Sequence, residues 1–148
     1  MGILMMPVYG SMTSTPNLEV DVDTDDNVDF TVEGPAQGVV LNTADDSITI
    51  ETQGVYTVTF STVALIFNNG ESTDLTFNIS INGSSVTLSQ VRSSPFGEDS
   101  PEDSIRTTLS RVDHFFLNEG DVIRVLCTSA TDNAFYVNAS LTVTKVGF

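Results

Sequence analysis

Alternating carboxylates near the N-terminus are the first residues whose types and spacing suggest chemistry. The run from Asp21 to Asn27 reads Asp-Val-Asp-Thr-Asp-Asp-Asn, and carboxylate oxygens at alternate positions are ligands that Ca²⁺ prefers. Counted from Asp21, the sixth position is Asp26 where an EF-hand has glycine, and the twelfth is Val32 where it has glutamate. The run is therefore no EF-hand, and we interpret it as a solvated acidic linker or, alternatively, as a weaker cation site between subunits. The same alternatives apply to a second acidic group, Glu98, Asp99, Glu102 and Asp103.

The single histidine is the second candidate, because an enzyme built on this chain would need it as a general base. His114 follows Asp113 in Arg111-Val-Asp-His-Phe-Phe-Leu, and neighbouring residues of a strand point to opposite faces, so the two cannot form a dyad. The sequence also lacks Cys-x-x-Cys, Gly-x-Ser-x-Gly, a phosphate-binding glycine loop and a histidine pair for zinc. We therefore expect no enzyme, no catalytic residue, no bound metal and no cofactor.

Cys127 is the third candidate and the only cysteine, so no disulfide can form within the chain. Its setting in Asp121-Val-Ile-Arg-Val-Leu-Cys predicts a small buried hydrophobic side chain. A disulfide with another chain and a reactive thiol are the alternatives.

The charge balance limits the partners. The chain has 20 acidic and 5 basic residues, and its net charge of -15 opposes binding to a phosphate backbone or to an anionic membrane surface. No run approaches the roughly 18 apolar residues of a membrane helix, and the N-terminus lacks the positive segment of a signal peptide. We therefore expect neither nucleic acid nor a membrane as a partner.

A strand over residues 54–67 is the element around which the others are expected to be arranged. Tyr56, Val58 and Phe60 alternate with small hydroxyl residues, the period-two pattern of a half-buried strand. From Ala64 to Phe67 the run is continuously apolar, which indicates a region covered on both faces. This pattern predicts a central strand.

Further strands are predicted on either side of it, with turn residues between them and no helix. Asn82-Gly83 lies between two apolar stretches and predicts a hairpin with a type I′ turn. Strands joined in this way, without an internal repeat, favour an all-β, two-sheet sandwich of jelly-roll type. The predicted strands are 28–33, 38–42, 47–51, 54–67, 73–81, 85–91, 105–117, 121–128 and 134–146.

The first 27 residues are predicted to lie outside this domain. Residues 1–10 are apolar and need a cover, whereas residues 11–27 change to Ser/Thr and then to acid, which is typical of a solvated linker. We divide the chain into an apolar connector arm (1–10), an acidic linker (11–27) and a jelly-roll domain (28–148). The arm is expected to dock into a groove of a neighbouring oligomer, or alternatively to fold back on an open sheet edge of its own subunit. Its residues are Ile3, Leu4, Met5, Met6, Pro7, Val8 and Tyr9.

Three segments of the domain resemble a known family in their order and spacing. Gly38-Val-Val-Leu-Asn precedes Ile48-Thr-Ile-Glu-Thr-Gln-Gly-Val-Tyr-Thr-Val-Thr-Phe, then comes Leu117-Asn-Glu-Gly-Asp-Val-Ile-Arg-Val, and last Ala139-Ser-Leu-Thr-Val-Thr-Lys-Val. Together, residues 38–148 resemble the TNF-like globular heads of the tumour necrosis factor and complement superfamily. The resemblance is greatest to the C-terminal domains of bacterial, Bacillus-type collagen-like spore-surface (exosporium) proteins. Residues 1–37 contain no Gly-X-Y repeat, so a collagen-like stalk is not part of the expected layout.

The resemblance implies a homotrimer in which one sheet of each jelly roll packs around a threefold axis. The chain carries more aromatic residues on its predicted strands than one sandwich interior needs, and aromatics are enriched in interface cores. The alternative is that about half of them fill the core. The trimer-interface candidates are Tyr56, Phe60, Phe115, Tyr136 and Phe148, from a larger set with Phe116 and Phe135.

Two functions are consistent with these features. The first is a structural protein, a trimeric subunit of a spore-surface appendage or exosporium fibre that the N-terminal arm joins into a filament or onto a surface. The second is a receptor- or carbohydrate-binding head of a phage or spore fibre. The expected location is a spore surface or another extracellular appendage reached without a signal peptide, or alternatively a phage virion. The partners are further copies of the chain and other surface or fibre proteins.

Overall fold

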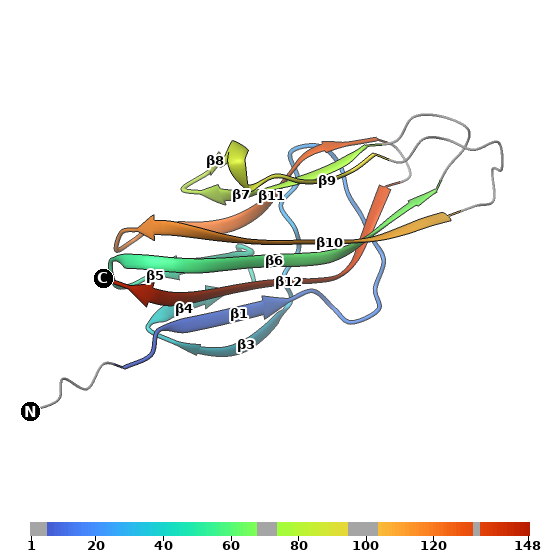
Figure 1. Ribbon diagram of the computed structural model, residues 1–148. Coiled ribbons are helices and arrows are strands. Elements are labelled where there is room, and N and C mark those ends of the chain that lie inside the picture. Colours follow the sequence, from blue (N-terminus) through green and yellow to red (C-terminus); the bar gives the residue numbers. More distant parts are fainter. Residues whose placement is uncertain (1–5, 68–73, 95–103, 132–133) are drawn as a thin grey trace, which may run out of the picture.

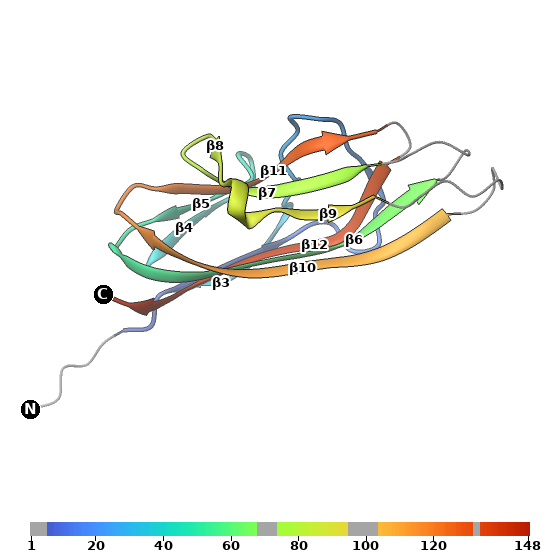
Figure 2. The same cartoon turned by 45° about the horizontal axis from the view of Figure 1, so that its top comes forward.

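The computed structural model describes residues 6–67, 74–94, 104–131 and 134–148, which form two antiparallel sheets packed face to face (Figure 1). Figure 2 shows the two layers side by side. Sheet A has the order β10 (Ser104–Leu117), β6 (Gly54–Phe67), β12 (Ala134–Gly147), β1 (Tyr9–Thr13) and β3 (Val32–Gln37), with β2 (Val20–Asp21) paired to β12. Sheet B has the order β4 (Val39–Asn42), β5 (Ser47–Ile50), β11 (Val122–Ala130), β7 (Leu75–Ile81) and β8 (Ser84–Ser85), with β9 (Val91–Ser93) paired to β7. The predicted all-β sandwich is confirmed.

Strand β6 is central, as predicted. It pairs with β10 along its whole length and with β12 on the other side. Its even-numbered residues from Tyr56 to Ala64 are buried, whereas the odd-numbered ones from Val55 to Val63 are half-buried. Leu65 and Ile66 are both buried, so the continuous apolar run does mark a region covered on both faces.

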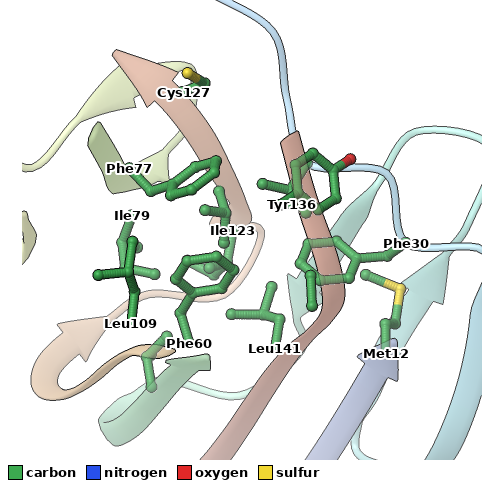
Figure 3. Close-up of a cluster of buried hydrophobic side chains, with 14 of the residues drawn as sticks. Met12, Phe30, Phe60, Phe77, Ile79, Leu109, Ile123, Cys127, Tyr136 and Leu141 are labelled. Atoms are coloured by element: carbon green, nitrogen blue, oxygen red, sulfur yellow. The ribbon is translucent and has the colours of Figure 1, made fainter. Parts of the chain in front are cut away.

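The core lies between the two sheets and is built around a row of rings (Figure 3). The ring of Phe77 in sheet B packs edge-on against Phe60, with centroids 5.4 Å apart, and against Tyr136, at 6.0 Å. Edge-on pairs of this kind contribute about 0.5–1.5 kcal/mol each beyond the burial of their area. These contacts fix the two sheets against each other.

The predicted linker over residues 11–27 is wrong, and with it the domain boundary at residue 28. Strand β1 lies between β12 and β3, and Met12 is fully buried in the core. Further along, Val22 is 2% exposed, and the backbone of residues 25–26 exchanges hydrogen bonds with Cys127, each 2.8 Å long. The acidic side chains made the segment look solvated, but its backbone and its isolated apolar residues belong to the sandwich.

The connector arm is correspondingly shorter than predicted. Tyr9 belongs to β1, and the carbonyl of Val8 accepts a hydrogen bond of 2.9 Å from the amide of Lys145. Met6 and Pro7 are exposed. Ile3, Leu4 and Met5 lie outside the described residues.

Two predicted strands differ from the structure. Residues 28–31 carry the alternation of a strand, with Val28 and Phe30 buried, but they cross between the sheets. The amide of Val28 donates to Val125 of sheet B, and that of Thr31 donates to Thr13 of sheet A, so no ladder forms. Residues 85–91 are interrupted by a 3-10 turn, η1 (Thr87–Ser89), because the side chains of Asn78 and Ser89 both donate to the carbonyl of Val86.

The turns follow their residue types. Asn82 and Gly83 have φ angles of 54° and 85°, as the predicted type I′ turn requires. At the other predicted turn Gly120 has φ of 90°, and the carboxylate of Asp121 accepts a 2.7 Å hydrogen bond from the amide of Asn118. The glycine supplies a backbone conformation that other residues rarely adopt.

Gly120→Val is therefore expected to lower the free energy of unfolding by about 1 kcal/mol or more. Open space surrounds the position where a Cβ would lie, so the cost comes from the positive φ and not from a clash. Chemical denaturation measures it, with Glu119→Val in the same turn as a control that adds the same side chain without the positive φ. Equal midpoints for the two variants would contradict this account of the turn.

Candidate functional site

His114 and Asp113 lie on opposite faces of β10, as predicted. In the register of the sheet His114 pairs with Thr57, on the outer side of β6, and Asp113 pairs with the buried Val58. The Asp113 carboxylate accepts a hydrogen bond from the Arg111 guanidinium at 2.9 Å. The acid is thus neutralised by an arginine and is not placed to act on the histidine.

An acidic hollow of about 340 Å³ collects four carboxylates beside the hydroxyl of Tyr136. Desolvation, opposed by a hydrogen bond from the amide of Phe30, raises the pKa of Asp46 there, and the negative charges of Asp29 and Asp45 raise it further. Within the described residues no three His, Cys, Asp or Glu side chains are arranged to hold a metal ion. The second acidic group lies outside the described residues. The four carboxylates are Asp21, Asp26, Asp29 and Asp46.

The thiol of Cys127 is buried, as predicted for a small hydrophobic side chain. Burial raises the pKa of Cys127 to about 12, and its Sγ donates to the carbonyl of Ser129 at 3.5 Å. The thiol is therefore protonated at neutral pH and is a poor nucleophile.

Three of the five trimer-interface candidates lie inside the protomer. Tyr56, Phe60 and Tyr136 are at most 3% exposed, so their assignment to an interface is wrong. The hydroxyl of Tyr56 donates to the carbonyl of Thr52 at 2.6 Å, and that of Tyr136 accepts from the amide of Asp29 at 2.8 Å. Both tyrosines thus fill the core and use their polar ends to hold neighbouring loops.

The other two candidates are more accessible. Phe115 is half-buried and packs against the core, on the inner side of β10 opposite Tyr56. Phe148 is 79% exposed at the end of the chain.

Figure 1 shows the outer face of sheet A turned toward the viewer, with no described helix or strand lying over it. Cross-strand pairs such as Phe116 with Val55 and Thr142 with Thr59 share this face. None of its residues on the four neighbouring strands is Asp or Glu, although the chain has 20 acidic residues. These residues are Arg106, Thr108, Ser110, Val112, His114 and Phe116 on β10; Val55, Thr57, Thr59, Ser61 and Val63 on β6; Ser140, Thr142 and Thr144 on β12; and Tyr9, Ser11 and Thr13 on β1.

This face combines small hydroxyls with exposed apolar side chains. Ser61 and Ser140 share a hydrogen bond of 3.1 Å between their hydroxyls, whereas Val112 and Phe116 are 58% and 56% exposed. Sheet B differs at β7, because the residues after this strand cover its outer side and bury Asn78 and Ser80 there. A low density of charge is what distinguishes the centre of a protein interface from ordinary surface.

The shape of the molecule is similar to two solved structures. A TNF protein, Eiger, from S. frugiperda superposes with a TM-score of 0.72 at 16% identity, over 95% of this chain and 93% of that one. The globular domain of the zebrafish complement 1qA protein gives a TM-score of 0.61 at 14% identity, over 94% and 97%. The chain has the TNF-like jelly-roll fold. No protein-family model matches the sequence, and no curated protein matches it significantly.

In this TNF-like jelly roll, the first described residues lie beside the last ones at one end of the sandwich. Residues 6–8 and 145–148 together with Thr52 line a hollow of about 490 Å³ there. The ammonium of Lys145 lies 4.7 Å from the ring centre of Phe148. None of the helical turns in the described part of the chain is long and apolar enough to cross a membrane.

Proposed function

We propose that this chain is a structural protein that forms a homotrimer through the outer face of sheet A. The observation that carries the proposal is the absence of carboxylates from the outer positions of β10, β6, β12 and β1. Three copies that each carry a net charge of -15 repel one another, so they associate most easily through strands whose outward positions carry no carboxylate. The Glu19 carboxylate, which pairs with Arg106 at 3.7 Å, comes from outside these strands. The TNF-like fold supports the same arrangement, since the family resemblance implies packing of one sheet around a threefold axis.

The composition of the face suits a permanent contact. Thr57, Thr59 and Ser61 are short, so neighbouring copies can approach the sheet closely, and their hydroxyls can hydrogen-bond to a partner or to trapped water. Val112 and Phe116 add apolar area at the edge strand. We expect each pair of copies to bury roughly 1,200–2,000 Å² or more.

The wider role that we propose is a subunit of a spore-surface appendage or exosporium fibre, linked to other trimers or to a surface through its N-terminal residues. The resemblance to spore-surface proteins supports this location, and the outer face of sheet A supports self-assembly. A receptor- or carbohydrate-binding head of a phage or spore fibre is the second candidate, because the resemblance extends to globular heads. The described residues present no arrangement of acid, base and nucleophile that favours an enzyme.

Electron microscopy of the purified chain at high concentration tests the structural role. A structural subunit is expected to form particles larger than one trimer, because its own N-terminal residues join the trimers. A fibre head is expected to remain as discrete trimers, since its N-terminus would be attached to another protein. Discrete trimers at every concentration would therefore favour the head over the structural subunit.

A further inference from the structure

The hollow at the end of the sandwich is an apolar surface without a cover among the described residues. Met6 is 72% exposed, Val146 59% and Phe148 79%, and all three line it. Exposed apolar side chains of this size that lie together mark a contact with another molecule. Its volume of about 490 Å³ lies in the range of roughly 300–1,000 Å³ found for binding sites.

The chain itself supplies a segment of matching chemistry. Ile3, Leu4 and Met5 directly precede Met6 in the sequence, and Met6 lines the hollow. Residues 1–5 carry no charged side chain. Removal of these three apolar side chains from water is favourable, as is removal of the apolar lining of the hollow.

Pro7 argues against docking of this segment in the hollow of its own subunit. A residue before proline is held in an extended conformation, so the backbone at Met6 does not turn back sharply. The same hollow on a second copy can be reached without such a reversal.

We propose that residues 1–5 of one copy dock in the end hollow of a second copy, around Val146 and Phe148. The donor segment is joined to Met6, which lines the hollow of its own copy, so two copies placed end to end can exchange their segments reciprocally. Such a contact closes on itself: it doubles the assembly and does not extend it.

This inference rests on the proposed function in one respect, because in a trimer the segments and hollows come in threes. Two trimers that meet end to end then form six contacts at once. Once the first segment docks, the others dock intramolecularly, which raises the overall affinity by about 10²–10⁴ over a single contact. A filament built from these pairs would need a further contact elsewhere on the trimer.

Native mass spectrometry of four proteins tests the inference: the full chain, a chain that begins at Met6, Val146→Asp, and Val40→Asp as the matched control. Val40 is 47% exposed on β4, away from the hollow. The full chain and the control are expected to form species of six copies, whereas the other two variants stop at three. A doubled species that persists in the chain beginning at Met6 would overturn the proposal.

Mixing the two defective proteins provides the sharper measurement. The chain beginning at Met6 retains its hollows, and Val146→Asp retains its donor segments, so a mixture restores half of the six contacts. The mixture is expected to double, at a concentration at least tenfold higher than the full chain needs. No mixed species at a hundredfold higher concentration would show that segment and hollow are not partners.

The same spectra separate this inference from the trimer. A full chain that converts from one copy to two would support the docking and overturn the trimer. A full chain that stops at three copies would support the trimer and overturn the docking.

Discussion

A chain that begins at Val28 is expected not to fold. Deletion of residues 1–27 removes β1 and β2, and with them the buried side chains of Met12 and Val22. Removing a large buried side chain costs about 2–5 kcal/mol. Strand β3 also loses its pairing with β1, so the total loss approaches the roughly 5–15 kcal/mol by which a domain is stable.

Far-ultraviolet circular dichroism and urea denaturation measure this effect. The control is the chain that begins at Met6, which retains every described strand and is expected to unfold cooperatively. The sequence alone predicts the reverse, a jelly roll of residues 28–148 that stands without its N-terminus. A cooperative transition of the Val28 chain at the control's midpoint would restore that prediction and contradict the structure.

Thr59→Asp is expected to convert the trimer into monomers. Thr59 lies on the central strand between Val112 of β10 and Thr142 of β12, in the middle of the outer face of sheet A. In an interface the new carboxylate would be desolvated without a partner, which costs about 3–5 kcal/mol. That loss corresponds to at least a hundredfold weaker association, since about 1.4 kcal/mol is a factor of ten.

Thr49→Asp is the matched control, because Thr49 lies on the outer face of sheet B between Val40 and Val122. Both threonines are half-buried in the single chain, so both variants are expected to fold and to give the same far-ultraviolet circular dichroism spectrum. Sedimentation velocity then reports the assembly state. Equal association by the two variants would show that sheet A is not the contact face.

Much of the fold could be predicted from the sequence where local patterns act alone. The alternation along β6 and the Asn82-Gly83 turn depend on neighbouring residues, and both are confirmed. The segment from residue 11 to 27 could not be read in this way. Its backbone is paired by β12 and β11, far away in the sequence, and only Met12 and Val22 signal the burial.

The candidate surface was harder to predict than the core. Aromatic side chains on strands indicated an interface, but Tyr56 and Tyr136 are large enough to fill the space between the sheets. The small hydroxyl residues of β6 were visible as the opposite face of the strand. A sequence does not distinguish a face of threonines that water covers from one that a partner covers, because short hydroxyls suit both.

The mass of the unmodified chain in solution tests the central claim most directly. Sedimentation equilibrium is measured at about 0.15 M salt, which screens interactions between charges more than about 8 Å apart. The repulsion due to the net charge of -15 then does not mask association. At micromolar concentration we expect species that contain three copies of the 15.9 kDa chain, or a multiple of three copies. A single species of 15.9 kDa under these conditions would contradict the account.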